Sequence, residues 1–255
     1  MTTQSLRQKI ANNEFTKPTS GYCQGYVQAN MVMIPKEFAD TFIDFAKENE
    51  KAIPILEVIR DSHYSKTLAN GADILKEIPF YNILIDGKLE KRCNNIDEYY
   101  TKDMVIFLIG CSFTFETPLI EEGIYLRHVD EGKNVAMYKS NITLNSVKNF
   151  KGNMVVSMRP IKKNRVDDVC SITSHYPSVH GSPIHIGNPL EIGISDINSP
   201  DYGDQILIKD DEVEVFWPCG VTTENVLKEL KLPFAITHAP GYMFVSDTKN
   251  SEYYV

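Results

Sequence analysis

The feature that most constrains the fold is an uninterrupted apolar run, Met104 to Ile109 (MVIFLI). A run without polar alternation is typical of a central strand that is covered on both faces, although its length alone also fits a buried helix. The run stops at Gly110-Cys111-Ser112. The sequence therefore predicts a core strand that ends in a turn carrying a thiol and a hydroxyl group.

The segments before this run alternate between strand and helix signals. Residues 26–34 are rich in β-prone side chains and end at Pro35, which favours a helix through Phe38, Phe42 and Ala46. Residues 81–85 are followed by Asp-Gly, the signal of a tight hairpin. Further strands are predicted at 53–59, 213–217 and 234–237, and further helices at 7–14 and from Thr222.

The middle of the chain differs in character and predicts a smaller domain. Residues 125–129, 135–140 and 154–159 read as short strands, residues 166–175 as a helix, and 185–186 as the edge of another strand. We therefore expect a two-layer block to be inserted into the first domain.

Charge and hydropathy exclude several classes of partner. The net charge of -8 and the absence of any Lys- and Arg-rich window argue against binding to nucleic acid. No run approaches the roughly 18 apolar residues that span a bilayer, and the N-terminus lacks the apolar core of a signal peptide. The five cysteines form an odd set without a CxxC pair, which indicates reduced thiols. We expect a cytosolic protein that does not bind membranes.

Four turns share one design, in which a Gly-containing break after an apolar strand carries Cys, His or hydroxyl groups. They are Thr19-Ser20-Gly21 with Gly25, Gly110-Cys111-Ser112, Cys219-Gly220-Val221-Thr222, and His238-Ala239-Pro240-Gly241. In open α/β sheets, ligands bind beyond the carboxyl ends of strands, where helix N-termini offer N–H groups to anions. The turns are thus candidates for a carboxylate-binding pocket that includes Ser20, Gly21, Ser112 and Thr222. The alternative is that the glycines only permit tight turns and the thiols only fill space.

Two arginines are candidates to hold a substrate carboxylate. Arg127 and Arg159 fall at the ends of predicted strands, and an arginine fork can bind a carboxylate through two parallel hydrogen bonds. Asn134, in the same segment as Arg127, is a further candidate for substrate binding. The alternative is a structural ion pair with Asp130, Glu131 or Asp247.

The histidines allow a metal-dependent alternative. His180, His185 and His238 are possible ligands for a divalent metal, with Glu116 or Asp247 beside them. Pro183 places the first two on a loop, so their spacing is not diagnostic, and hydrogen-bonded structural histidines explain them as well. We therefore predict no cofactor and keep the metal as an alternative.

Seven segments give the chain a recognisable resemblance. They are TSGYCQGYVQAN (19–30), FLIGCSFTFE (107–116), RHVDEGKNVAMYKSNI (127–142), VVSMRP (155–160), VHGSPIHIG (179–187), FWPCGVT (216–222) and ITHAPGYMFVSD (236–247). In these segments the chain resembles a bacterial hydro-lyase family that also occurs as a domain of mitochondrial D-glutamate cyclase. It departs from the family at Cys23-Gln24-Gly25, where Ala-Pro-Gly is usual.

The resemblance implies both a fold and an activity. The implied fold is α/β, with a three-layer αβα domain and a smaller two-layer α+β domain, which we place at residues 1–122 and 188–255 and at residues 123–187. The implied activity is that of a carbon-oxygen lyase. In the cyclase, D-glutamate loses water as its amine closes on the side-chain carboxyl group to give 5-oxo-D-proline.

These expectations combine into a catalytic hypothesis with alternatives. A small amino or hydroxy acid is held by the arginines and turn N–H groups, while Glu116 and His238 act as acid and base and Asp247 orients them. In a second version, Cys111 or Cys219 attacks the substrate carboxyl group, which requires a lowered thiol pKa. A metal-dependent lyase or hydrolase and a non-catalytic amino-acid-binding module remain open. We expect a homodimer from the general prevalence of two-fold symmetry.

Overall fold

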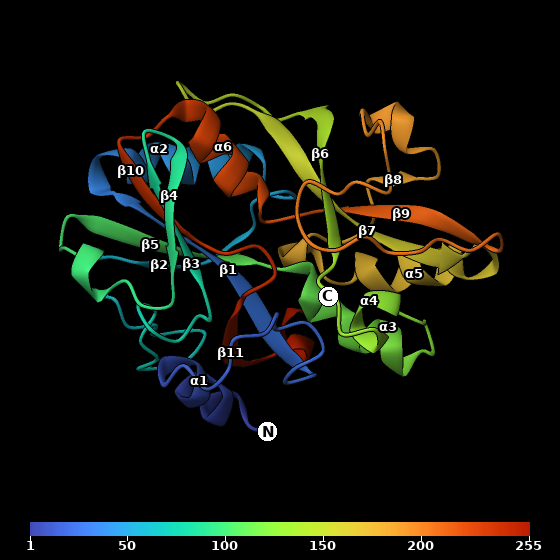
Figure 1. Ribbon diagram of the computed structural model, residues 1–255, viewed down its shortest axis with the longest axis horizontal. Helices are drawn as coiled ribbons and strands as arrows, with labels where there is room; N and C mark the ends of the chain where they lie inside the picture. The colour runs from blue at the N-terminus through green and yellow to red at the C-terminus, as the bar shows by residue number, and fades with distance from the viewer.

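Eleven strands form two β-sheets in the computed structural model, which describes residues 1–255 (Figure 1). In chain order they are β1 (Tyr26–Pro35), β2 (Ile55–Ile59), β3 (Tyr81–Ile85), β4 (Lys88–Cys93), β5 (Met104–Gly110), β6 (Ala136–Thr143), β7 (Asn153–Lys162), β8 (His185–Ile186), β9 (Glu212–Pro218), β10 (Phe234–His238) and β11 (Phe244–Lys249). The α-helices are α1 (Thr3–Ala11), α2 (Lys36–Glu48), α3 (Glu116–Glu121), α4 (Arg127–Asp130), α5 (Val166–Ser174) and α6 (Thr222–Leu230).

The first sheet is built around β1 and is antiparallel throughout. Its strand order is β2-β5-β1-β10-β3-β4, and β11 pairs with β1 beyond the end of β10. The apolar run forms β5, which lies along the other edge of β1 with Val32 opposite Phe107. Every residue of β5 is buried. The predicted core strand is therefore confirmed.

Both faces of this sheet are covered, by different kinds of structure. On one face, α2 and α6 pack their apolar side chains against β1 and β5; the Phe42 and Phe107 rings, for example, lie edge to face with centroids 4.7 Å apart. On the opposite face, Leu68, Ile74 and Ile78 of the segment between β2 and β3 pack against the strands. This arrangement gives the α/β class that the sequence predicts.

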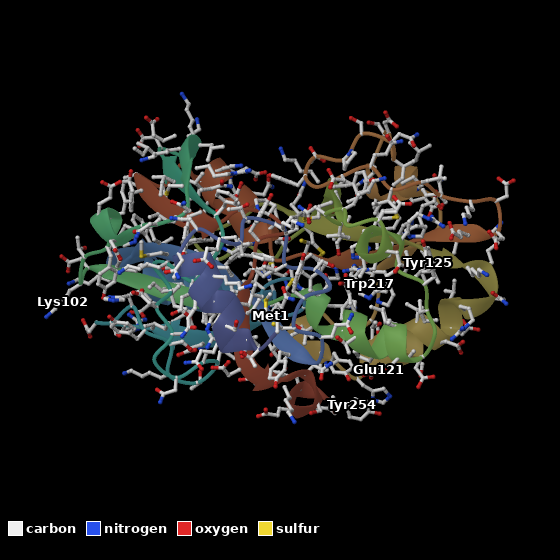
Figure 2. All side chains as sticks on the ribbon, turned by 60° about the horizontal axis from the view of Figure 1, so that its bottom comes forward. Met1, Lys102, Glu121, Tyr125, Trp217 and Tyr254 are labelled. Carbon is white, nitrogen blue, oxygen red and sulfur yellow. The ribbon has the colours of Figure 1, made fainter.

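The second sheet forms the core of the other lobe, on the right in Figure 1. Its order is β6-β7-β9-β8, and all of its pairs are antiparallel. Trp217 of β9 is fully buried against Val169 of α5, and Figure 2 labels it within this lobe, whereas Lys102 lies at the far end of the other one. β9 lies beyond residue 187, so the second sheet extends past the predicted insertion. The boundaries of the domains stay a prediction.

Most elements lie within a few residues of their predicted positions, with two exceptions. Residues 125–129, predicted as a strand, instead lead into the helical turn α4. A strand would point successive side chains to opposite faces, whereas this turn lets Arg127 and His128 both enter the interior toward different carboxylates. The second exception is β11, which the sequence did not predict. No helix of the protein has the length and apolarity needed to cross a membrane.

Candidate functional site

A buried carboxylate cluster lies where β5 ends. After β5 the chain makes a short 3-10 helix, Ser112–Phe115, and α3 then begins at Glu116, which is 3% exposed. Arg159 of β7 donates to Oε1 of Glu116 from Nη2 at 2.6 Å and from Nε at 3.1 Å. Ser20 donates to Oε2 at 2.9 Å, and Nε2 of His128 lies 2.8 Å from Oε1. Residues from both lobes thus meet on one carboxylate.

Arg159 is the centre of this cluster. Its side chain is completely buried and also donates to the hydroxyls of Ser112, at 3.0 Å, and Ser157, at 3.2 Å. The guanidinium carbon lies 5.5 Å from the ring centroid of Phe115 and 5.4 Å from that of Trp217, within the range of cation-π attraction. Because its hydrogen bonds and aromatic neighbours fix the guanidinium in place, Arg159 orients Glu116.

The charges around Glu116 set its ionisation. Burial alone would raise the pKa of this carboxyl group, but the charges of His128 and Arg159 and their hydrogen bonds outweigh burial and lower the pKa to about 2. Glu116 is therefore ionised at neutral pH. It can hold the His128 imidazole in position, but it carries no proton to give to a leaving group.

A polar cavity of about 470 Å³ borders the cluster. Its lining residues are Lys17, Pro18, Ser20, Gly21, Tyr22, His128, Val129, Gly132 and Lys133. A small niche of about 10 Å³ shares Gly21 and Tyr22 with this cavity and extends to Gln28 and Glu116. The lining residues thus include two lysines, a serine, a tyrosine and a histidine, and the cavity is large enough for a small carboxylic acid.

Four of the predicted site residues, Ser20, Ser112, Glu116 and Arg159, meet in the cluster, and Gly21 lines the cavity beside it. The turns do not meet as carboxyl ends of parallel strands, because the sheets are antiparallel. The first turn reaches Glu116 through Ser20, and the second reaches Arg159 through Ser112. These two turns therefore meet at one cluster, and the substrate-binding role of their residues stays a prediction.

The thiols do not meet the requirement for a nucleophile. Cys111 and Cys219 are buried in one apolar cluster with Phe113 and Met243. Burial raises the pKa of the Cys111 thiol, and it raises the pKa of Cys219 to about 11. Both thiols are therefore protonated at neutral pH, which contradicts the alternative in which either attacks the substrate.

Arg127 forms a structural ion pair, so its predicted role in substrate binding gains no support from the structure. Its guanidinium donates to both carboxylate oxygens of Glu212, at 2.9 and 2.6 Å, and also to the Leu207 carbonyl group. Both side chains are buried. A structural ion pair exists, but its acid is Glu212 and none of the three acids named as alternatives, and the buried pair uses three of the five guanidinium N–H donors.

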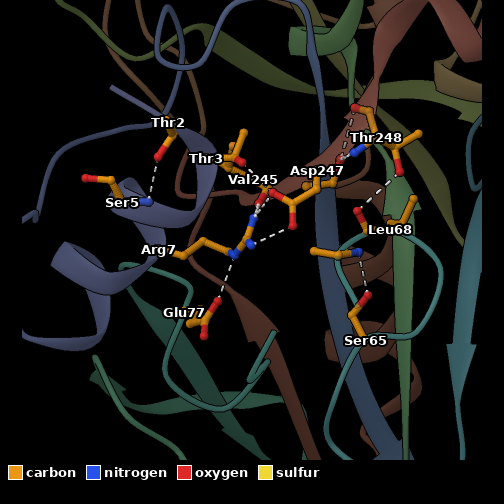
Figure 3. A network of polar contacts seen from close by, with 12 residues as sticks. Thr2, Thr3, Ser5, Arg7, Ser65, Leu68, Glu77, Val245, Asp247 and Thr248 are labelled. Carbon is orange, nitrogen blue, oxygen red and sulfur yellow. Dashed lines mark hydrogen bonds and ion pairs between the residues drawn. The ribbon is translucent and has the colours of Figure 1, made fainter. Parts of the chain in front are cut away.

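Asp247 also belongs to a structural ion pair, between α1 and β11. Figure 3 shows Arg7 of α1 between Asp247 of β11 and Glu77, with Arg7 donating to both carboxylate oxygens of Asp247. Thr3 donates to the same carboxylate. This network fastens α1 to β11, so the predicted role of Asp247 in orienting an acid or base is not supported.

Thr222 and Asn134 also serve the structure. The Thr222 hydroxyl accepts from the Val155 amide at 2.9 Å and donates to its carbonyl group at 3.2 Å, which ties the start of α6 to β7. Asn134 donates to the Pro240 carbonyl group at 3.0 Å and packs directly on Gly241. Each contact joins one of the Gly-containing turns to the other lobe. Neither Thr222 nor Asn134 is among the residues that line the cavity.

The three histidines proposed as metal ligands lie apart from one another. Nδ1 of His180 faces the Lys51 carbonyl oxygen at 3.0 Å, Nε2 of His185 faces that of Asn188 at 2.9 Å, and Nδ1 of His238 lies against the backbone of Met31. No group of three or more His, Cys, Asp or Glu residues in the protein is placed to hold a metal ion. The donor set of the metal-dependent alternative therefore does not form.

The imidazole beside Glu116 is His128, not the predicted His238. His238 is buried, and burial lowers its pKa to about 4. His128, Lys17 and Lys133 are the site residues that sequence reasoning missed. The segment RHVDEGK (127–133) contains both His128 and Lys133 and was the available signal. Because a strand was predicted there, the inward direction of the His128 side chain was not foreseen.

Comparison with known proteins defines the family. The sequence model of the family described as D-glutamate cyclase matches residues 105–247, a range that contains Ser112, Glu116, His128 and Arg159. The chain belongs to the D-glutamate cyclase family. Lys17 and Ser20, which also line the cavity, lie outside the residues that the family model matches.

Similar proteins of full length are found in several bacteria. Proteins named "Putative hydro-lyase" share 44% identity in Natranaerobius thermophilus (98% of this chain, 96% of that protein), 47% in Staphylococcus haemolyticus (97% and 95%) and 46% in Geobacillus kaustophilus (99% and 96%). Among solved structures, a nitrogen repressor-like protein from Methanococcus jannaschii aligns over 95% of this chain and 97% of its own, with a TM-score of 0.41 and 12% identity. Similarity that low says nothing about the function of a D-glutamate cyclase family member.

Proposed function

We propose that this protein is a hydro-lyase that closes D-glutamate to 5-oxo-D-proline with loss of water in the cavity beside Glu116. The family and the names of its relatives support a hydro-lyase-type reaction. The observation that carries the proposal is the ionised Glu116 carboxylate, which Arg159 holds from one side and which contacts His128 in the cavity wall.

The reaction neither consumes nor releases protons overall, so it requires only a group that carries protons from one atom of the substrate to another. The substrate ammonium loses two protons, its nitrogen bonds to the side-chain carboxyl carbon, and the carbon-oxygen bond of that carboxyl group breaks. The departing oxygen takes up both protons and leaves as water. A group that accepts protons at the amine and delivers them to the oxygen therefore meets the whole requirement.

His128 is suited to this task. The residue lines the cavity, and its Nε2 lies 2.8 Å from the Glu116 carboxylate, which holds the imidazole in position. Lys17 in the same wall supplies positive charge for a substrate with two carboxylates, and Lys133 lies beside it in an ion pair with Glu131 at 2.7 Å. The niche of about 10 Å³ beside Glu116 has room for about one water molecule, and we assign it to the water that leaves.

The experiment is a direct assay of conversion. The purified protein is incubated with D-glutamate, with L-glutamate and with other small amino and hydroxy acids, and the loss of one water is followed by mass spectrometry. We expect 5-oxoproline from D-glutamate. Glu116→Gln should lower the turnover by about 10²- to 10⁴-fold, because the proton carrier loses its charged partner.

The control is Glu191→Gln, which makes the same substitution at an exposed glutamate. It should retain the wild-type turnover, and circular dichroism should show both variants to be folded. Full turnover by folded Glu116→Gln would refute the assignment of the site. Stabilisation of the wild type by D-glutamate without any conversion would favour the amino-acid-binding module instead.

A further inference from the structure

The turn that carries Ser20 is bridged by one buried side chain from outside it. Gln28 of β1 is 3% exposed, and its Nε2 donates to the carbonyl oxygens of Thr19, at 3.0 Å, and Tyr22, at 3.2 Å. These are the first and last residues of the turn, which the Tyr22 amide closes on the Thr19 carbonyl group at 3.1 Å. A single amide group therefore joins both ends of the turn around Ser20.

The two ends of this turn are held differently. The Thr19 amide also donates to the Gly241 carbonyl group at 3.0 Å, and the Thr19 hydroxyl accepts from the Met243 amide at 3.0 Å. The Tyr22 carbonyl group, in contrast, has no partner in the protein other than Gln28. The second end of the turn thus depends on Gln28.

The orientation of the Gln28 amide follows from its partners. A carbonyl oxygen only accepts hydrogen bonds, so the nitrogen of this amide, and not its oxygen, must face the turn. The oxygen, Oε1, is buried and has no partner in the protein, which costs free energy. Gln28→Met removes the two donated bonds and this unpaired acceptor together, so the variant should stay folded.

The turn matters because Ser20 is the only protein partner of one oxygen of Glu116. Its hydroxyl donates to Oε2 at 2.9 Å, whereas the other contacts of this carboxylate, including that with His128, all use Oε1. With both oxygens bonded, the carboxylate is fixed in the direction that faces His128. The turn also packs beside this histidine, since a Cβ at Gly21 would lie 3.1 Å from Cγ1 of Val129.

We propose that Gln28 is a positioning residue of this site. It holds the turn from Thr19 to Tyr22 in place, so that Ser20 fixes Glu116 in the orientation that faces His128. Gln28 acts through Ser20 and not on the substrate. The expected effect on turnover rests on the proposed function, whereas the expected effect on the turn does not depend on any reaction.

The kinetic test combines Gln28→Met and Ser20→Ala in the conversion assay. Each variant should lower kcat by about 10- to 100-fold and leave KM within about threefold of the wild type, because a misplaced Glu116 affects the transition state more than the bound substrate. The double variant should be no slower than Ser20→Ala, since both changes remove the same contact. Effects that multiply in the double variant, or full turnover by Ser20→Ala, would overturn the proposal.

The matched control is Asn49→Leu. Nδ2 of Asn49 likewise donates to two carbonyl oxygens, those of Phe45 at 2.8 Å and Asn145 at 2.9 Å, but Asn49 lines neither the cavity nor the niche. This variant should keep the wild-type kcat and KM. A loss of turnover as large as that in Gln28→Met would show that the loss of any such bridge has this effect, and it would overturn the proposal.

Hydrogen exchange separates this inference from the proposed function. The Tyr22 amide, which closes the turn, should exchange about tenfold faster in Gln28→Met than in the wild type and at the wild-type rate in Asn49→Leu. Unchanged exchange in Gln28→Met would overturn the proposal even where D-glutamate is converted. Faster exchange in a protein that converts none of the assayed acids would refute the proposed function and leave Gln28 as the residue that holds the turn.

Discussion

Two buried arginine and glutamate pairs in this protein are alike in contact distance and burial and differ in their surroundings. Arg159 with Glu116 and Arg127 with Glu212 each have a shortest contact of 2.6 Å, and all four side chains are at most 4% exposed. The Glu212 carboxylate is otherwise bonded only to the Lys209 amide, whereas Glu116 is also bonded to Ser20 and His128. The first pair borders a polar cavity of about 470 Å³ through these two residues, and Glu212 of the second pair lines a smaller cavity of about 210 Å³.

The difference shows what identifies a functional arginine. The residue type and the bidentate fork predicted a carboxylate ligand equally well for both arginines, and both indeed bind a carboxylate of the protein. Only the other partners of the carboxylate separate the two pairs, because an imidazole can carry a proton and a backbone amide at neutral pH cannot. The two pairs therefore predict different outcomes for the same substitution.

The largest expected effect comes from replacing each arginine by methionine. Arg159→Met and Arg127→Met should each destabilise the fold by about 3–5 kcal/mol, because each leaves a buried carboxylate without its cation. Turnover of D-glutamate per folded molecule should be lost in Arg159→Met and retained in Arg127→Met. Urea unfolding and the conversion assay measure the two quantities.

A second substitution serves as the control for the stability effect. In Arg127→Met/Glu212→Leu both charges are removed, so most of the lost stability should return. Loss of turnover in the stable double variant would mean that the Arg127 pair contributes to catalysis, and the contrast between the two pairs would be wrong.

A smaller effect is expected in acid, where the two pairs should behave alike. The Arg159 and His128 charges lower the pKa of Glu116 to about 2 against the opposing effect of burial, and the Arg127 hydrogen bonds lower that of Glu212 in the same way. A carboxyl group whose pKa is lowered by folding stabilises the protein above its ordinary pKa of 4.5, and this stabilisation is lost as the pH falls. For Glu116 the loss extends from about pH 5 to about pH 2.

The measurement is the free energy of unfolding as a function of pH in wild type, Glu116→Gln and Glu212→Gln. Each substitution removes one titrating carboxyl group, so each variant should lose less stability than the wild type below pH 5. A variant whose curve runs parallel to the wild type would show that its glutamate is not ionised by its partners in the folded state.

Much of the fold could be predicted because its strands carry local signals. The apolar run of β5 and the Asp-Gly turn between β3 and β4 act within a few residues, and the structure has both. β11 was missed because its place in the sheet depends on pairing with β1, more than 200 residues earlier in the chain. The short turn α4 was misread because local β propensity gave way to the burial of two polar side chains.

The candidate site was predicted in part for the same reason. Glu116, Arg159, Ser20 and Ser112 stand at strand ends and turns, where sequence patterns point to polar chemistry. The choice of imidazole depends on which histidine faces Glu116, and this follows from the direction of one helical turn. Lys17 and Lys133 look like ordinary surface lysines in sequence, because only the fold brings them to one cavity.

The most direct test of the central claim compares two histidines under one assay. Conversion of D-glutamate is measured for His128→Asn and His238→Asn, with thermal unfolding to confirm that both are folded. His128→Asn should lose about 10²-fold or more in turnover, because the proton carrier beside Glu116 is gone, and His238→Asn should keep the wild-type rate. An inactive, folded His238→Asn beside a fully active His128→Asn would contradict the account.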